Sequence, residues 1–591
     1  MGRGRAKSMG SPVAKGMQMT KRWVFVGIVF VGAAGTLRAE SEPIRASGKT
    51  VVPQPLMTYL ADELAYTMEH MATEDGTKPF YLNYTAYEEH TATISASLGA
   101  ITQDQRGDER NLNIDLRVGD YTLDNTHQLR GGGPSHVFGS GNIALPLGDD
   151  ADAVRHELWY HTDKMFKNSA KRLTQVKTDL KVKVEEEDRS DDFSREEAHV
   201  AYEEPVTLVF DGKGWSERLR KISAIAREFP LIYSSTVTVG AYAGIRYMVT
   251  SEGTRLQTAE RRYRITMSAG TKAEDGMDLS QYSDFNAASL EGLPNDAKIE
   301  EAFRGVIKQV LALREAPLAE PYIGPAILRN RASGVFFHEI FGHRIEGHRQ
   351  KDVTEGQTFT KKLNQPVLPT FISVFDDPTM ARLGDIDLRG HYDFDDEGVA
   401  SSNVALVENG VLKTFLMSRS PVQGSPRSNG HGRRQSGNAV VSRQANLIVR
   451  STKQVPFDEL RRLLVEECTR QGRPYGLLFE DISGGFTMTS RRGPQSFKVL
   501  PIVVYRVYAD GRPDELIRGA DIVGTPLTSF EKILCTGDDI GVFNGSCGAE
   551  SGWVPVAAAS PSVLVATIEI EKRTRDQSRP PILPPPLAVK P

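Results

Sequence analysis

The spacing of apolar residues predicts four amphipathic helices, in which hydrophobic positions recur every three or four residues. They span 58–73, 216–228, 296–313 and 456–470. A fifth and longer helix is predicted over 151–184, a charged segment that contains neither glycine nor proline.

Alternating apolar and polar residues, or runs of β-forming residues, predict strands in both halves of the chain. In the first half they lie at 80–87, 91–99, 111–118, 232–239, 246–250 and 261–268. In the second half they lie at 445–449, 497–508 and 563–571, and 404–413 reads as a hairpin that turns at Asn409-Gly410. The glycine-rich segments 130–141 and 418–434 are predicted loops, the second of them mobile. Helices and strands thus mix in the first half, whereas strands dominate the second, with a boundary marked by Pro317 and Pro321.

Length and composition limit the class of protein. A chain of 591 residues suggests two or three domains, and 25% charged with 39% hydrophobic residues is typical of a soluble globular protein. The formal net charge of −4 gives no reason to expect nucleic acid as a partner. The proline-rich tail at 574–591 is predicted to be disordered.

The first 39 residues are typical of a signal peptide. Basic residues precede a short apolar run at 23–34, and small residues that suit cleavage follow. We expect an exported protein, periplasmic or extracellular, whose mature chain begins near Glu40 and has no membrane contact after cleavage. An uncleaved N-terminal anchor is the alternative, and Met17 or Met19 is an alternative start.

The segment 336–348 carries the most specific chemistry. His338 and His343 are candidate zinc ligands, and Glu339 is placed to act as general base on zinc-bound water. On an ideal helix a spacing of five puts the two rings roughly 140° apart, too far to share one ion. The helix must therefore break between them, and Gly342 is the natural position, because glycine tolerates the backbone angles of a helix end.

The same H-E-x-x-x-H spelling occurs at His156, Glu157 and His161. No glycine interrupts that segment, so an unbroken helix would direct its two histidines to different faces. Spelling alone is therefore weak evidence. The alternative for 336–348 is an aromatic-rich core helix whose histidines have hydrogen-bond partners.

A catalytic zinc site needs a third protein ligand. Glu346, His348 and a cysteine are the candidates. Among the three cysteines the residues themselves favour Cys547, because glycines flank it in a turn, over Cys468 in a helical pattern and Cys535 in an apolar one. Whether Cys547 is a better candidate than His348 stays open at this point.

Seven short motifs follow one another between 320 and 572. They are FHEIFGHRIEG at 337–347, VFDDPT at 374–379, DDEGV at 395–399, ENGVLK at 408–413, ANLIV at 445–449, IRGA at 517–520 and NGSCG at 544–548. With these motifs in this order, the chain resembles the TldD/PmbA metallopeptidases. The resemblance is weaker before residue 300, and His348 departs from the family pattern.

The resemblance implies zinc held by His338, His343 and Cys547, with Glu339 as general base. It implies an α+β fold of two domains: an N-terminal α/β domain with a long helix at 50–316, and a C-terminal metallopeptidase domain rich in antiparallel β-sheet at 317–573. It also implies peptide or unfolded-protein substrates, and a homodimer or a heterodimer with a family paralogue.

We therefore expect a zinc metallopeptidase that hydrolyses peptide bonds in unfolded proteins or peptides. Arg518 and His431 are candidates to stabilise the oxyanion. The alternative is a non-catalytic subunit or exported binding protein with a structural metal, closed by a fourth ligand such as Glu346 or His348. Modulation of DNA gyrase, a role attached to the family by name, does not fit the acidic charge balance or the export signal.

Overall fold

The computed structural model describes residues 51–129, 139–181, 188–352, 354–490, 497–524, 530–573, 580–584 and 586. The leader at 1–39 and most of the tail at 574–591 lie outside these ranges, so the signal peptide and the disordered tail stay predictions. Most of the predicted loop at 130–141 is also outside them. Everything described belongs to one compact unit, Pro43–Pro591. Within the described ranges, no helix has both the length and the apolar character that crossing a membrane requires.

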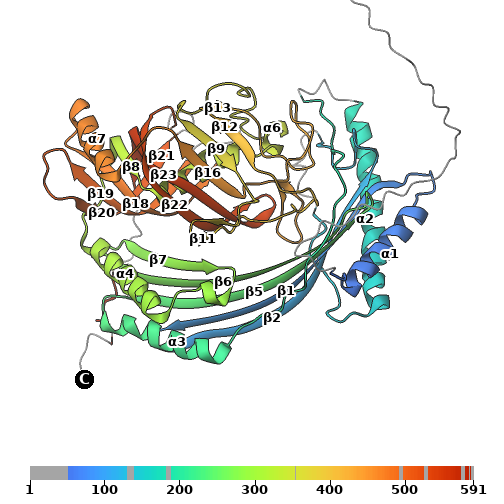
Figure 1. Cartoon of the computed structure of the whole chain (residues 1–591), viewed down its shortest axis with the longest axis horizontal. Coiled ribbons are helices and arrows are strands. Elements are labelled where there is room, and N and C mark those ends of the chain that lie inside the picture. Colours follow the sequence, from blue (N-terminus) through green and yellow to red (C-terminus); the bar gives the residue numbers. More distant parts are fainter. Residues whose placement is uncertain are drawn as a thin grey trace, which may run out of the picture. The chain divides into compact units, whose positions relative to one another are not determined.

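The first half of the chain forms a seven-stranded sheet in the order β3-β2-β1-β5-β6-β4, with β7 beside β6 (Figure 1). Its strands are β1 (Pro79–Ser97), β2 (Ala100–Val118), β3 (Ile143–Ala144), β4 (Val200–Tyr202), β5 (Ser234–Thr250), β6 (Arg255–Lys272) and β7 (Asp278–Ala287). All its pairs are antiparallel except β4 with β6. The segments predicted as separate strands at 80–87 and 91–99 join in the single long strand β1.

Helices cover one face of this sheet. They are α1 (Pro55–His70), α2 (Ala151–Leu180), α3 (Gly212–Ala224) and α4 (Asp296–Glu315), with short 3-10 turns at η2 (Ile225–Glu228) and η3 (Leu290–Gly292). Odd-numbered residues of β5, from Val237 to Val249, are buried under the helices. Because side chains alternate along a strand, even-numbered residues such as Arg246 project from the opposite face.

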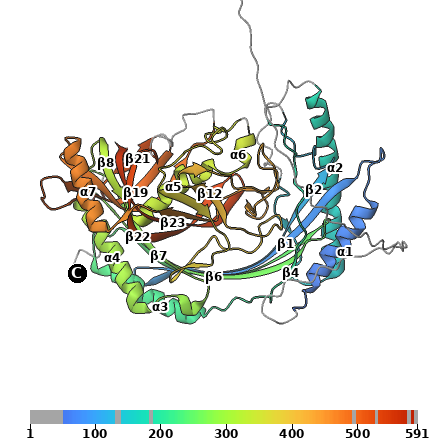
Figure 2. The same ribbon diagram turned by 45° about the horizontal axis from the view of Figure 1, so that its top comes forward.

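The second half forms a twelve-stranded sheet whose main path is β13-β12-β9-β16-β23-β21-β19-β18-β8 (Figure 2). The strands are β8 (Tyr322–Leu328), β9 (Ile372–Asp376), β12 (Val404–Glu408), β13 (Val411–Leu412), β16 (Asn446–Ser451), β17 (Gln454–Val455), β18 (Tyr475–Thr487), β19 (Phe497–Tyr508), β20 (Glu515–Ile517), β21 (Ala520–Gly524), β22 (Ile533–Ala549) and β23 (Gly552–Lys572). Two small ribbons pair β10 (Arg382–Leu383) with β11 (Ile386–Asp387), and β14 (Gly432–Arg433) with β15 (Val441–Ser442).

Most pairs in the larger sheet are antiparallel, and the exceptions are β8 with β18, β16 with β23, and β17 with β22. The helices of this half are α5 (Asn330–Ile340), α6 (His348–Lys351) and α7 (Phe457–Arg470). The predicted α+β class, with a second half rich in antiparallel sheet, is confirmed. The division into two domains near Pro317 stays a prediction.

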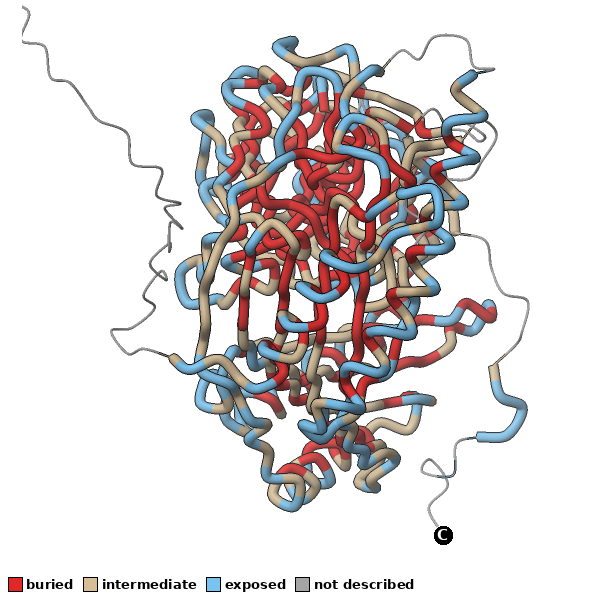
Figure 3. The backbone as a smooth tube through the Cα atoms, turned by 90° about the vertical axis from the view of Figure 1, so that its right-hand side faces the viewer, coloured by how far each residue is buried: buried red, intermediate tan, exposed pale blue. Residues whose placement is uncertain are grey.

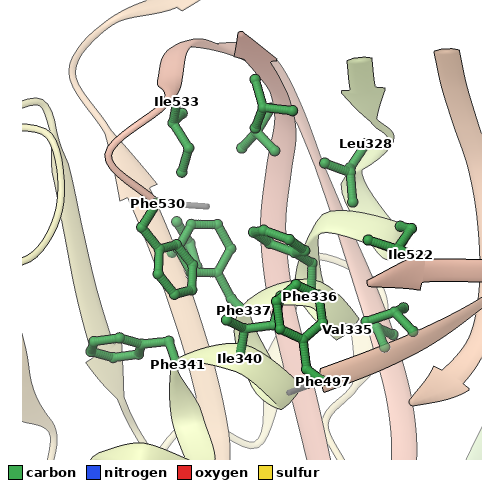
Figure 4. Packing of buried hydrophobic residues seen from close by; sticks show 14 of the residues in the cluster. Leu328, Val335, Phe336, Phe337, Ile340, Phe341, Phe497, Ile522, Phe530 and Ile533 are labelled. Atoms are coloured by element: carbon green, nitrogen blue, oxygen red, sulfur yellow. The ribbon is translucent and has the colours of Figure 1, made fainter. Parts of the chain in front are cut away.

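Helix α5 is buried on every side, and Figure 3 shows that buried residues run through the interior of both sheets. Phe336, Phe337 and Phe341 surround Phe530, with ring centroids 5.5, 5.3 and 6.1 Å from that of Phe530 (Figure 4). Each aromatic ring that is removed from water stabilises the fold by a few kcal/mol, on the order of 25 cal/mol per Å² of apolar area. This packing fixes the helix that carries His338.

Buried ion pairs join the polar face of the first sheet to loops of the second half. Arg246 donates to Asp396 and to the carbonyl oxygens of Phe394 and Asp395. Arg419 donates to both carboxylate oxygens of Glu252 at 2.7 and 2.8 Å. Arg419 is completely buried, whereas residues 423, 424, 426 and 427 of the same segment are exposed, and the mobility predicted for 418–434 stays a prediction.

Two carboxyl groups beside Arg419 share a buried site. Burial raises the pKa of Glu397 to about 8, and the charge of Asp395 adds to the rise, while Arg419 and Arg117 oppose it. Burial likewise raises the pKa of Asp395 to about 6. The native state therefore holds the Glu397 proton more tightly than the unfolded chain does. Stability from this proton is complete below the ordinary glutamic acid pKa and is lost as the pH rises through the native value.

We predict that the free energy of unfolding falls between about pH 5 and pH 8, and that Glu397→Gln protein loses part of this dependence. Urea unfolding at a series of pH values measures the effect. Glu408→Gln, at an exposed carboxylate on β12, is the control that should behave as wild type. Parallel pH profiles for wild type and Glu397→Gln would contradict the prediction.

Candidate metal centre

Helix α5 ends after Ile340, and a 3-10 turn, η4 (Gly342–Arg344), follows it directly. His338 lies in the last turn of the helix and His343 in the 3-10 turn. The two ring centroids are 5.1 Å apart and the ring planes meet at 76°. The predicted break in the helical register between the two histidines is therefore present, and it brings their rings together.

Gly342 is required for space and not for backbone freedom. The φ angle of Gly342 is not in the left-handed region, so a residue with a side chain would tolerate the same backbone angles. A Cβ at this position, however, would overlap the side-chain amide of Gln444. Gln444 in turn donates from Nε2 to the carbonyl oxygen of His338 at 3.3 Å. The sequence thus predicts the right residue for the break, for a different physical reason.

Strand β22 supplies Cys547 close to its hairpin with β23. The Sγ atom of Cys547 lies 3.3 Å from Nε2 of His343, and one donor atom each from Cys547, His338 and His343 all lie within 4.8 Å of one another. Arg443 fixes the hairpin, because it donates to the carbonyl oxygen of Cys547 at 2.7 Å and to Ser551 Oγ at 2.9 Å. All three candidate ligands are buried.

The three donors suit a zinc ion. In a tetrahedral zinc site a nitrogen and a sulfur ligand are about 3.5 Å apart, because the bond lengths are about 2.0 and 2.3 Å. The separation of 3.3 Å between His343 and Cys547 is close to this value. Burial would raise the pKa of the Cys547 thiol, but His343, His338 and Arg443 outweigh burial and hold it well below the ordinary value. The site therefore favours the thiolate form that binds metal.

Glu339 points to the same centre. Its Oε2 atom lies 4.0 Å from Nε2 of His343, and the residue is 9% exposed. Burial raises the pKa of Glu339 above its ordinary value, although the two histidines oppose the rise. Gly485 of β18 lies against the side chain, since a Cβ there would be 2.9 Å from Glu339 Cγ. The carboxylate is thus confined beside the three donors.

Glu346 contacts the ring nitrogen of His343 that faces away from Cys547. Its carboxylate oxygens lie 3.2 and 3.3 Å from Nδ1 of His343, so the other ring nitrogen, Nε2, is the one that faces Cys547. Burial would raise the pKa of Glu346, but His343 and Arg349 lower it to about 2. A metal-binding imidazole usually donates its second N–H to such a carboxylate, which fixes the ring and its tautomer.

His348 and Glu550 complete the surrounding charges. Arg349 donates to Glu346 at 2.8 Å and to both oxygens of Glu550 at 2.6 and 2.7 Å, and His348 lies 3.7 Å from Glu550. Neither Glu346 nor His348 belongs to the three-donor cluster. In the described structure Cys547 is therefore the third donor beside the two histidines, as the resemblance implies.

Other candidates from the sequence lie elsewhere. Cys468 and Cys535 are free thiols in a separate apolar cluster, and burial raises the pKa of Cys468 to about 11. Arg518 pairs with Asp275, and His431 contacts Asn429 and Asp376, so both have structural partners. His156 and His161 lie on the unbroken helix α2, as predicted for the second motif.

Glu346, Arg443 and Gln444 are the site residues whose roles the sequence did not reveal. Glu346 was considered only as a metal ligand. Its spacing of three from His343, and of three again to Arg349, is the signal that places all of them on one side of a turn. Arg443 and Gln444 come from a distant segment, and no local pattern identifies them.

The second half of the chain is similar to known proteins in sequence. Residues 322–572 match the family model of the PmbA/TldA metallopeptidase C-terminal domain. A metalloprotease of Archaeoglobus fulgidus is 30% identical over 247 residues, which cover 40% of this chain and 51% of the relative. A zinc metalloprotease TldD homolog of Saccharolobus solfataricus is 28% identical over 254 residues, covering 42% of this chain and 51% of the relative. The chain thus spans about half the length of these two curated relatives.

Solved structures share the fold over more of the chain. TldE from Thermococcus kodakarensis superposes with a TM-score of 0.57 at 14% identity, covering 87% of this chain and all of that one. A Thermotoga maritima protein described as a putative modulator of a DNA gyrase gives a TM-score of 0.56 at 18% identity, with the same coverage. At these identities the likeness concerns the fold alone.

Fold and site together define an α+β protein with a buried His-His-Cys centre beside a glutamate on its antiparallel second half. With the family match over 322–572, this half of the chain is similar to the PmbA/TldA metallopeptidase C-terminal domain.

We predict that Cys547→Ser protein loses zinc affinity by more than the roughly 10–100-fold that is typical of losing an outer-shell partner, because the mutation removes a direct donor. Competition against a chromogenic chelator, with elemental analysis, measures the loss. Cys535→Ala, a buried thiol outside the centre, should keep wild-type affinity. Equal affinities for wild type and Cys547→Ser would show that the sulfur does not bind.

We also predict that Glu346→Gln lowers zinc affinity roughly 10–100-fold, because His343 loses the carboxylate that orients it. The same chelator competition applies. Glu355→Gln is the matched control, since Glu355 contacts Arg349 at 3.4 Å but is not a partner of His343. Unchanged affinity in the Glu346 variant would remove its orienting role.

Proposed function

We propose that this chain is a zinc metallopeptidase that hydrolyses peptide bonds in unfolded proteins or short peptides. The observation that carries the proposal is the convergence of His338, His343 and Cys547 with the carboxylate of Glu339, 4.0 Å from His343. Relatives named as metalloproteases, one of them as a zinc metalloprotease, support the same activity.

In this proposal His338, His343 and Cys547 hold the metal, and Glu339 is the general base. A zinc ion supplies Lewis-acid chemistry, since it polarises a carbonyl group and makes water a stronger nucleophile at neutral pH. Glu339 accepts a proton from the attacking water as the water oxygen bonds to the carbonyl carbon. It then delivers this proton to the leaving nitrogen as the C–N bond breaks, which yields one carboxylic acid and one amine product.

The number of protein donors favours catalysis over a structural metal. A structural zinc has four protein ligands, whereas a catalytic one keeps a position open. Among the described residues three donors lie within 4.8 Å of one another, and Glu339, which lies next to them, is assigned as the base. The two local candidates for a fourth ligand have other partners: Glu346 has His343 and Arg349, and His348 has Glu550. A non-catalytic subunit with a closed metal site is therefore the less supported alternative.

Strand β22 offers a place for an extended substrate. From Ile540 to Ala549 this strand pairs with β23 on one side, and no described strand pairs with its other side. A peptide that adds to such an edge is bound through backbone hydrogen bonds, which do not depend on its sequence. We propose that substrates add at this edge. A peptide bound there passes Cys547 and Glu339, where its scissile bond is cleaved.

Export and partnership are further proposals. The leader at 1–39 supports an exported protein, periplasmic or extracellular, and the family resemblance supports a homodimer or a heterodimer with a TldD/PmbA paralogue. Size measurement of the purified mature protein, alone and with a paralogue, tests the second of these.

We predict that Glu339→Gln lowers kcat/KM for casein or a peptide by about 10²–10⁴-fold while zinc stays bound, because the proton acceptor is lost and the ligands are not. Glu157→Gln is the matched control, since it alters the glutamate of the second H-E-x-x-x-H sequence on α2. Retained activity in zinc-loaded Glu339→Gln protein would remove Glu339 as the base.

A further inference from the structure

The segment that carries Arg389 crosses one face of the larger sheet, between Asn544 of the edge strand β22 and Asn446 of β16. The backbone N–H of Arg389 donates to Oδ1 of Asn544 at 3.0 Å, and Nδ2 of Asn544 donates to the carbonyl oxygen of Asp387 at 2.8 Å. The next residue, Gly390, donates to Oδ1 of Asn446 at 3.1 Å. Asn544 precedes Cys547 by three residues, so the backbone of Arg389 is fixed about 10 Å along the strand from the proposed zinc ligand, at a side chain that projects from the opposite face of β22.

The guanidinium of Arg389 has no counter-ion. Within the described ranges it forms neither an ion pair nor a side-chain hydrogen bond, and its Nη1 atom is buried without a partner. Burial is the main cause that lowers its pKa to about 10, and the charges of Arg264 and Arg262 add to the effect, with Asp284 and Glu260 opposing it. The side chain as a whole is half-buried, but a guanidinium nitrogen that is removed from water without a partner costs free energy.

The neighbouring arginines have partners of their own. Arg262 and Arg264 are two residues apart on β6, on the face away from the helices, and they pair with Glu260 at 3.1 Å and Asp284 at 3.3 Å. Arg389 therefore adds a third positive charge whose own carboxylate is missing.

Arg344 shows the contrasting case of a buried guanidinium without a carboxylate. It donates from Nη1 to the carbonyl oxygens of Glu339 and Ile340 and so completes the end of α5. Arg389 has no such structural role for its side chain. A backbone fixed to the sheet edge, with an unpaired guanidinium beside two further arginines, is what recognition of an anion requires.

We propose that Arg389 binds a carboxylate of the peptide substrate, either an Asp or Glu side chain or the C-terminal carboxylate, three or four residues from the scissile bond. The spacing follows from the rise of about 3.3 Å per residue of an extended strand over the distance between Asn544 and Cys547. This inference rests on the proposed peptidase function. It adds a preference for acidic substrates to a site that otherwise binds only the peptide backbone.

The test uses the zinc-loaded full chain and a series of neutral, unstructured fluorescent peptides. One series moves a single Glu, or a Gln in its place, along the peptide, and a second compares a free C-terminal carboxylate with an amide. We measure kcat/KM and the cleaved bond. Peptide affinity for Glu339→Gln protein, by fluorescence anisotropy, reports binding without cleavage.

Wild type should favour Glu over Gln about tenfold at one position, three or four residues from the cleaved bond, as expected for a charge-assisted hydrogen bond. If Arg389 binds the C-terminal carboxylate of the peptide, kcat/KM for the peptide with a free C-terminus should exceed that for the C-terminal amide by a similar factor. Arg389→Gln should reduce the preference to about onefold, Arg389→Lys should keep part of it, and high salt should weaken it in wild type. Arg382→Gln is the control, since Arg382 is exposed and pairs with Asp387.

The inference is overturned if wild type shows no preference at any position, or if Arg389→Gln keeps it with unchanged zinc content and unfolding midpoint. If wild type cleaves no peptide, the peptidase proposal fails, and the anisotropy measurement still decides the role of Arg389. Equal binding of acidic and neutral peptides there would overturn the inference on its own.

Discussion

The two imidazoles of His338 and His343 can share one ion only because helix α5 ends between them. Three contacts accompany that end. Gln444 occupies the space that a side chain at Gly342 would need, Arg344 takes up the carbonyl oxygens of Glu339 and Ile340, and Phe336 and its neighbours hold the helix in the core. The local sequence is aromatic and helix-forming, so the break depends on tertiary packing from residues a hundred positions away.

Buried charge around the centre is arranged in a chain of pairs. Arg443 anchors the hairpin that carries Cys547, Arg349 links Glu346 to Glu550, and Glu346 orients His343. Each carboxylate has a cation beside it, which offsets the cost of desolvation. Arg389 differs because no carboxylate among the residues that the structure describes pairs with it, and for that reason it bears on what the site receives.

The motifs and periodicity predicted much of this molecule. Amphipathic spacing located α1, α4 and α7 to within a few residues, and the second H-E-x-x-x-H sequence was correctly read as an ordinary helix. The residues of the candidate metal site were predicted from two kinds of evidence. Local spacing supplied His338, Glu339 and the break at Gly342, whereas Cys547 depended on the family resemblance, because no local rule links residues 204 apart.

The sequence could not give the reasons for these features. Gly342 looked like a residue chosen for its backbone angles, and only the position of Gln444 shows that it is chosen for its small size. Likewise, the composition of 418–434 does not reveal that Arg419 is buried against Glu252, which lies in the turn between β5 and β6. The role of Gly342 and the burial of Arg419 both depend on contacts with residues far away in the sequence. The periodicity of apolar residues does not predict such contacts.

X-ray absorption at the zinc edge of the purified protein tests the central claim most directly. The account predicts one sulfur at about 2.3 Å, two imidazole nitrogens at about 2.0–2.1 Å and one further light atom that exchanges with solvent. A spectrum without sulfur, or one with four protein ligands and no exchangeable position, would contradict it.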